Sequence, residues 1–175
     1  DESSPVNLVF AQADAVQYFL NSGRRDEVHK LELIENIGEE CVFIVTGADS
    51  ALRDDEDLEE ADGLRLGIAS ADSGVAVTFD YMASQMPGLR DIAVRYGDTA
   101  PLLDQLNEPG GPVDAVMTVH RPKELSPEVA RALSSPDTFR FVQLDADRLE
   151  QELWDGRRVY RSMHLGMPGA EKPVS

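Results

Sequence analysis

A short loop rich in serine and glycine has the residue types that best fit the binding of a small molecule. The loop "SADSG" covers residues 70–74 and separates an apolar run from a helical pattern. Ser70, Ser73 and Thr78 offer hydroxyl groups, and Gly74 lets the backbone approach a ligand closely. Backbone amides at the start of a helix attract negative charge, such as a carboxylate. The sequence therefore predicts a site for a small polar ligand at this loop.

The same residues also fit a purely local role. Ser73 or Asp72 can act as the N-cap of the helix that follows, because both side chains accept hydrogen bonds from free amides at a helix start. Asp72 partly opposes an anionic ligand and could instead recognise an ammonium group. Spacing alone does not separate a cap from a ligand loop.

Metal-binding patterns are weak. His29, His120 and His164 form no HxxxH or HExxH pair, and there is no Cys/His cluster, so a zinc site is disfavoured. The single cysteine, Cys41, lies in the apolar run "CVFIV" and is expected to be a small buried hydrophobe. The acidic run at residues 54–60 lacks the alternation and central glycine of an EF-hand loop. We expect no metal and no cofactor.

Catalytic patterns are weak as well. Ser73, His120 and Asp14 could in principle form a hydrolase triad, but Ser73 lies in "ADSGV" and not in a Gly-x-Ser-x-Gly elbow. No Walker motif is present, and "GIASADSG" is too long for Gly-x-Gly-x-x-Gly. The sequence indicates a binding protein and not an enzyme.

His120 is a candidate through its place at the end of a predicted parallel strand. Ligands of open α/β sheets collect outside the carboxyl ends of the strands. Arg121 follows it and could hold a carboxylate with two hydrogen bonds, although Pro122 favours a plain surface turn. A structural histidine is the competing interpretation for His120.

The charge of the chain excludes some partners. The 175 residues carry 16 Lys and Arg against 33 Asp and Glu, a formal net charge of −17. Nucleic acids and anionic membrane surfaces both require a basic face, so neither is an expected partner. The sequence has no run of about 18 apolar residues of the kind that spans a membrane.

The second part of the chain alternates strand and helix patterns. Apolar runs at residues 64–69, 91–96, 113–120 and 139–144 are each followed by a helical pattern, with Asp98 and Ser126 as expected N-caps. This alternation is typical of βαβ units, which place helices on both faces of a parallel sheet. The sequence predicts an α/β fold with a doubly wound, mostly parallel sheet.

The first part is less regular. Residues 6–11 predict a buried strand, residues 13–20 a helix, and residues 30–36 and 40–47 two further strands. The acidic segment after them is expected to be a solvated connection with a short helix at residues 55–60. Residues 166–175 contain two prolines and two glycines and predict an extended tail.

The order of these pieces resembles the TAXI-type solute-binding proteins of tripartite ATP-independent periplasmic (TRAP) transporters, which have the type II periplasmic binding-protein fold. The likeness rests on "VNLVFAQADAVQYFLN", on "ECVFIVTGADSALRDDEDLEEADGLRLGIASADSG", on "LLDQLNEPGGPVDAVMTVHRP" and on "FRFVQLDADRLEQEL". It covers roughly residues 6–165. The family has Thr after Ser-Gly, where this chain has Val75.

The resemblance implies an organisation in two lobes. Residues 1–50 would be part of the first lobe with a crossover strand, residues 51–63 an acidic connection, residues 64–165 a second α/β lobe, and residues 166–175 a tail. The family begins with a further strand–helix region and continues beyond the matched part. We therefore expect this sequence to correspond to the middle of such a protein, or to a reduced relative.

The resemblance also implies a function in binding. An extracytoplasmic, periplasmic protein would capture a small organic acid or amino acid by hinge closure and deliver it to the membrane permease of a TRAP system. Gln12 and Asp14 would face the cleft from the first lobe, and Ser70, Ser73, Gly74 and Thr78 from the second. His120 and Arg121 join them by the strand-end argument only. The alternatives are a ligand-sensing regulatory domain and a protein-interaction module on the same fold.

Overall fold

Five short apolar runs form the strands of one sheet in the computed structural model, which describes residues 10–23, 32, 34–36, 38–122, 124–149 and 158–161. The spatial order is β3-β2-β4-β1-β5. The strands are β1 (Cys41–Gly47), β2 (Arg65–Ile68), β3 (Ala93–Tyr96), β4 (Ala115–His120) and β5 (Phe139–Phe141).

One strand runs against the other four. β2 pairs in parallel with β3 and with β4, whereas β1 pairs antiparallel with both β4 and β5. The register places Cys41 opposite His120 and Thr46 opposite Ala115. The predicted α/β fold with a mostly parallel sheet is confirmed, with β1 as the reversed strand.

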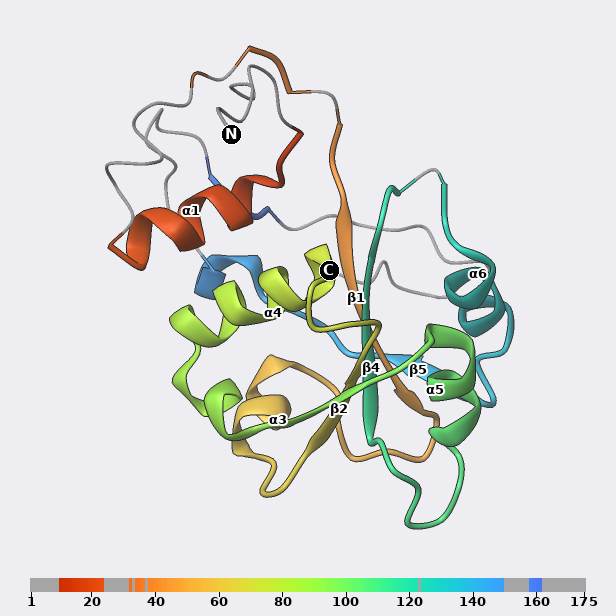
Figure 1. Cartoon of the computed structure of the whole chain (residues 1–175). Helices are drawn as coiled ribbons and strands as arrows, with labels where there is room; N and C mark the ends of the chain where they lie inside the picture. The colour runs from red at the N-terminus through yellow and green to blue at the C-terminus, as the bar shows by residue number, and fades with distance from the viewer. Residues whose placement is uncertain are drawn as a thin grey trace, which may run out of the picture.

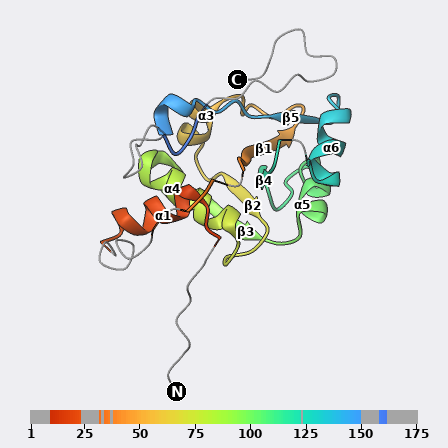
Figure 2. The same ribbon diagram turned by 90° about the horizontal axis from the view of Figure 1, so that it is seen from above.

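Helices cover both faces of this sheet (Figures 1 and 2). One side carries α4 and the shorter helices near it, and the other carries α5 and α6, so the sheet is doubly wound. The helices around the sheet are α3 (Asp55–Glu60), α4 (Gly74–Gln85), η1 (Pro87–Asp91), α5 (Thr99–Gln105), α6 (Pro127–Ser134) and η2 (Ala146–Leu149).

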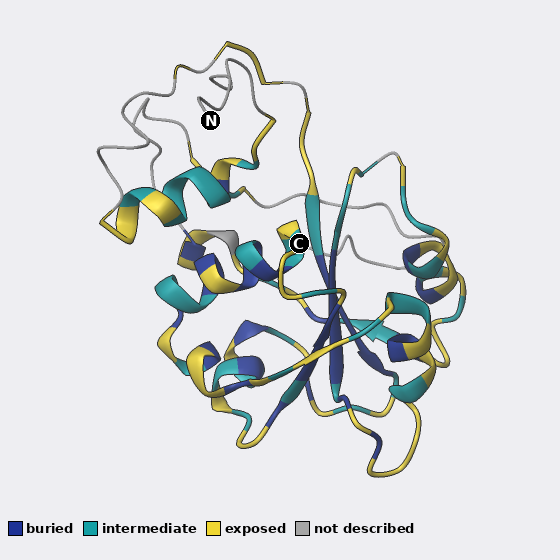
Figure 3. Cartoon of the chain, in the orientation of Figure 1, coloured by how far each residue is buried: buried dark blue, intermediate teal, exposed yellow. Residues whose placement is uncertain are grey.

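The core lies in two layers because successive strand residues point to opposite faces. Ile44 and Met117 pack with the α4 side, whereas Val45 and Val116 pack with the α5 and α6 side. Figure 3 shows this burial concentrated in the strands and on the inward sides of the helices. The sheet therefore forms a rigid base for the loops at its edges.

Side-chain caps fix where several helices begin. Ser126 accepts a hydrogen bond from the Val129 amide at 3.3 Å, with Pro127 in the first turn of α6, as expected. Asp54 caps α3 by accepting from the Asp57 amide at 3.0 Å. Asp98 occupies the N-cap position of α5, but its side chain makes no capping hydrogen bond. The predicted N-cap position of Asp98 is therefore confirmed, but the capping hydrogen bond is absent.

The first part of the chain departs from the expected strands. Residues 10 and 11 are not in a strand, and residues 6–9 lie outside the described residues. Residues 32 and 34–36 are not in a strand either, and the rest of the predicted strand at 30–36 is not described. The helix expected at residues 13–20 is present as α1 (Ala13–Asn21), which packs against α4 (Figure 1). The tail at residues 166–175 lies outside the described part.

Candidate functional site

Asp14 joins three distant segments of the chain. Its carboxylate oxygen Oδ2 accepts one hydrogen bond from Thr78 Oγ1 on α4 and another from the Tyr160 hydroxyl, each at 2.6 Å. Its other oxygen, Oδ1, accepts from the Ala15 amide at 2.7 Å. Asp14 is 6% exposed and Thr78 is 1% exposed. Two residues predicted from different sides of a cleft are thus in direct contact.

Tyr81 completes the surroundings of Asp14. Its ring centroid lies 5.6 Å from that of Tyr160, and its side chain is fully buried. The Tyr81 hydroxyl and Gln17 Oε1 are buried and have no hydrogen-bond partner among the described residues. We refer to Asp14, Thr78, Tyr81 and Tyr160 as the Asp14 cluster.

The phenols of the Asp14 cluster are held in the neutral form. Burial, and then the negative charge of Asp14, raises the pKa of Tyr81 to about 12. Burial also raises the pKa of Tyr160, and the charge of Asp14 and the hydrogen bond to it act in the same direction. A buried phenol beside a carboxylate loses its proton with difficulty because a second negative charge would lie next to the first.

Gln12 and Gly74 meet beside this cluster. A Cβ atom added to Gly74 would lie 2.4 Å from Gln12 Oε1, so the close approach of α1 to the start of α4 requires a glycine or a shift of Gln12. Gln12 Nε2 donates a hydrogen bond to Glu40 Oε2 at 2.6 Å. The predicted pair of segments therefore meets at a second point.

The hydroxyls of the loop at residues 70–74 are engaged within the loop. Ser73 Oγ accepts from the Ala76 amide at 3.2 Å and donates to the Ser70 carbonyl at 2.6 Å, so Ser73 is the N-cap of α4. Ser70 Oγ donates to Asp72 Oδ1 at 2.9 Å. The local role that the sequence left open is present, and a ligand role for these hydroxyls stays a prediction.

His120 and Arg121 are not joined to the Asp14 cluster. His120 Nε2 lies 2.7 Å from Thr118 Oγ1 on the same strand, and Arg121 forms an exposed ion pair with Glu124 at 3.8 Å. No hydrogen bond or ion pair within the described residues links either one to Asp14 or to the loop. Both lie at the end of β4, as expected, but their part in a site remains a prediction.

The triad considered from the sequence is not assembled. Ser73 bonds to the loop, Asp14 to Thr78 and Tyr160, and His120 to Thr118. Thr118 is buried within the sheet, so its pairing with His120 does not present an accessible nucleophile. Within the described part of the chain, no group of three or more His, Cys, Asp or Glu side chains is arranged to hold a metal ion.

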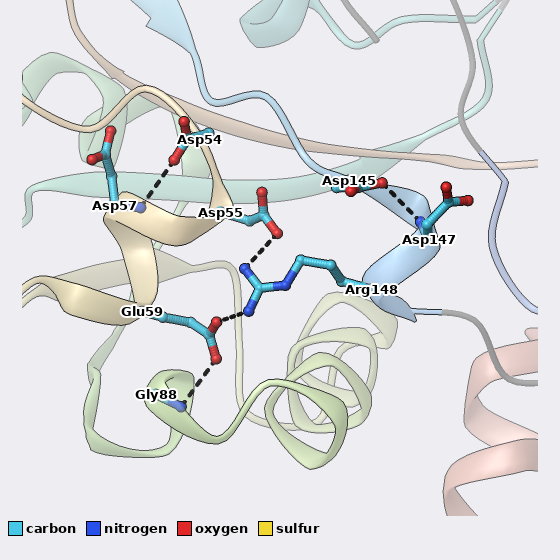
Figure 4. Close-up of polar contacts among 8 residues, drawn as sticks. All are labelled: Asp54, Asp55, Asp57, Glu59, Gly88, Asp145, Asp147 and Arg148. Carbon is cyan, nitrogen blue, oxygen red and sulfur yellow. Dashed lines mark hydrogen bonds and ion pairs between the residues drawn. The ribbon is translucent and has the colours of Figure 1, made fainter.

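A separate acidic cavity of about 540 Å³ lies between α3 and the segment at residues 143–148. Figure 4 shows Arg148 directed at two carboxylates of α3. Arg148 pairs with Asp55 at 2.9 Å and also with Glu59. Burial lowers the pKa of Arg148, but its hydrogen bonds with Glu59 and Asp55 and their charges raise it more, so the net pKa is raised. Arg148 thus neutralises part of the negative charge of α3.

A second cavity, of about 430 Å³, lies at the start of β2. It is lined by residues 50–52 and 61–64, at the two ends of the acidic connection, and by Arg65 and Asp114. The last two form a two-point ion pair. Neither cavity includes a residue of the Asp14 cluster.

Comparison with known proteins gives no family. No protein-family model matches the chain, and no curated protein matches it. Among solved structures, the substrate-binding domain assigned to a molybdenum ABC transporter of Clostridium difficile is 12% identical with a TM-score of 0.42. The aligned region covers 79% of this chain and 65% of that chain. A likeness of this size carries no information about function.

No helix in the described part of the chain combines the length and the apolar character that a membrane span needs.

Proposed function

We propose that the chain is the solute-binding part of a TRAP-type secondary transporter and that it captures a small organic acid or amino acid outside the cytoplasm. The observation that supports this is the contact between Asp14 and Thr78. The sequence resemblance assigns these residues to opposite sides of a solute cleft, and they lie 2.6 Å apart across α1 and α4.

The charges around the Asp14 cluster favour an amino acid over a dicarboxylate. Asp14 accepts hydrogen bonds, so an ammonium group of a solute is a fitting replacement for the hydroxyls of Thr78 and Tyr160. The start of α4 carries the positive end of a helix dipole and favours a carboxylate. A zwitterion meets both requirements, whereas a second carboxylate would face Asp14 and Asp72.

In this proposal the second lobe is residues 64–165, the partial first lobe is residues 1–50, and the protein works in the periplasm with a membrane permease. Gln12, Ser70, Ser73 and Gly74 would line the rim of the solute site. His120 and Arg121 would contact the solute only from the carboxyl end of β4. The role is binding, with no chemical step.

Thermal unfolding tests this proposal. A ligand that binds only the folded chain raises its melting temperature, and above the dissociation constant the stabilisation grows with the logarithm of the ligand concentration. L-Glutamate, L-glutamine and a dicarboxylate such as succinate are added at increasing concentrations. A rise with one amino acid supports the proposal, and transport of that solute by a reconstituted TRAP permease in the presence of the chain would establish the transporter role. Binding without transport would favour a sensor domain.

A protein-interaction module is the second candidate. Phe10 and Ile34 are 80% and 76% exposed, and a contact surface would require such side chains to form one contiguous patch. An unchanged melting temperature with every solute would favour this candidate.

A further inference from the structure

Within the described residues, no apolar side chain of helix α1 belongs to a core cluster, and its one buried side chain is polar. Asp14 is its one fully buried residue, and its apolar side chains are half-buried or exposed, as Phe19 is at 38%. Most of the stability of a docked helix normally comes from its buried apolar face. The hold of α4 on α1 therefore depends strongly on the Thr78 hydroxyl, which is the donor to Asp14 that lies on α4.

The contacts at the edge of this interface are exposed. Gln12 bonds to Glu40, and Arg161 pairs with Glu39 at 2.6 Å. Hydrogen bonds and ion pairs in contact with water contribute little, because water replaces them at small cost. They join α1 and the segment at residues 158–161 to the residues just before β1, and they add little stability.

Two buried polar groups, one on α1 and one on α4, lack partners in the described part of the chain. Gln17 lies one turn beyond Asp14 on α1, and Tyr81 lies one turn beyond Thr78 on α4. Neither the Tyr81 hydroxyl nor Gln17 Oε1 is hydrogen-bonded within the described residues. Leaving buried polar groups unpaired costs free energy, and opening of the interface would let water bind the Tyr81 hydroxyl. This offsets part of the cost of opening.

We propose that α1 and residues 158–161 form a releasable clasp over α4, held closed by the Asp14 carboxylate. The clasp opens while the five-stranded sheet stays folded. Opening uncovers Thr78 and Tyr81, which are inaccessible in the closed form. The inference rests on these contacts and not on the proposed function, although it would give a solute a way in.

Hydrogen exchange of backbone amides, followed by mass spectrometry on the full chain without solute, tests the clasp. Amides of α1 are expected to exchange faster than those of β1 and β4 in the unaltered chain. Thr78→Val removes one donor to Asp14 and should speed exchange in α1 by about tenfold, since the bond exists only in the closed form.

Thr46→Val is the matched control. Thr46 is a fully buried threonine of β1 whose hydroxyl donates to the Gly47 carbonyl at 3.1 Å. That bond persists when the clasp opens and is lost only when the sheet unfolds. Thr46→Val should therefore speed exchange in β1 and β4 and leave exchange in α1 unchanged.

Two results would overturn the clasp. One is that Thr46→Val speeds amide exchange in α1 as much as in the sheet. This would mean that α1 opens only by global unfolding. The other is unchanged α1 exchange in Thr78→Val. If Thr78→Val does not fold, Asp14→Asn weakens the same bond from the α1 side, and the same two criteria apply to it.

Discussion

Thr78 Oγ1 lies 2.6 Å from Asp14 Oδ2, although 64 positions separate the two residues in the sequence. The bond joins the first described helix of the chain to the helix that follows the serine-rich loop. Together with Tyr160, it makes one buried carboxylate oxygen the meeting point of three segments. This point is the basis of the predictions on α1.

Asp14→Ala is expected to lower the free energy of unfolding by about 2 kcal/mol. The substitution leaves the hydroxyls of Thr78 and Tyr160 buried without an acceptor, and each unpaired group costs about 1–3 kcal/mol. Asp14→Asn keeps one oxygen acceptor and should cost less. Urea denaturation followed by circular dichroism measures both. Asp72→Ala serves as the control on an exposed acid, with an expected change within about 0.5 kcal/mol.

Ser73→Ala is expected to lower the free energy of unfolding by about 1 kcal/mol. It removes the hydroxyl that accepts from the Ala76 amide at the start of α4. Ser73→Asn keeps a capping side chain and should restore most of the loss. If both variants were as stable as the unaltered chain, the cap would contribute nothing, and a ligand role for Ser73 would gain weight.

Most strands and helices around the sheet could be predicted from the sequence. The apolar runs that became β2 and β4 are short and are followed by helices with recognisable starts, such as Ser126 with Pro127. Local signals of this kind depend on neighbouring residues only. The reversed direction of β1 is different, because it depends on pairing with β4 across more than sixty residues.

The part of Tyr160 in the candidate site could not be predicted. Its hydrogen bond to Asp14 spans 146 positions, and no local pattern marks a lone tyrosine as the partner of a distant acid. Asp14 and Thr78 were predicted as site residues, but their direct bond was not. Ser73 was difficult for a different reason. Its local sequence fits a helix cap and a ligand loop equally well, so the sequence could not decide between them.

The tyrosines should titrate in two classes. The chain has four tyrosines, and the pKa of Tyr81 is raised to about 12, with that of Tyr160 also raised. The folded-state pKa lies above the unfolded value of about 10. The contribution of these phenols to stability is therefore fully present below about pH 10 and is lost as pH rises through the folded-state pKa. Absorbance at 295 nm should show two tyrosines ionising late, together with alkaline unfolding. Tyr160→Phe should remove one late step, and four equal early steps would contradict the buried cluster.

Arg148→Met is expected to destabilise the acidic segment. It leaves Asp55 and Glu59 near Asp54 and Asp145 with no cation between them (Figure 4). Arg148 is 38% exposed, but the Asp55 and Glu59 side chains are only 9% and 15% exposed, so removing their cation leaves two poorly solvated carboxylates and we expect a loss of about 1–3 kcal/mol. Added salt should recover part of it by screening the repulsion.

Arg131→Met is the matched control for that charge effect. Arg131 pairs with Asp104 at 2.7 Å, but both side chains are largely exposed. The free energy of unfolding should change by no more than about 0.5 kcal/mol, and the acidic segment should not be affected. Equal losses in the two arginine variants, measured by urea denaturation at two salt concentrations, would show that the charges around Arg148 are not a special case.

Isothermal titration calorimetry of the full chain with L-glutamate, L-glutamine and succinate tests the proposed function most directly. The account predicts saturable heat with an amino acid at a stoichiometry near one, weaker heat with succinate, and a clear loss of affinity in Asp14→Asn. Saturable heat that is unchanged in Asp14→Asn would remove the Asp14 cluster from the site. Absence of heat with all three solutes would contradict the solute-binding proposal.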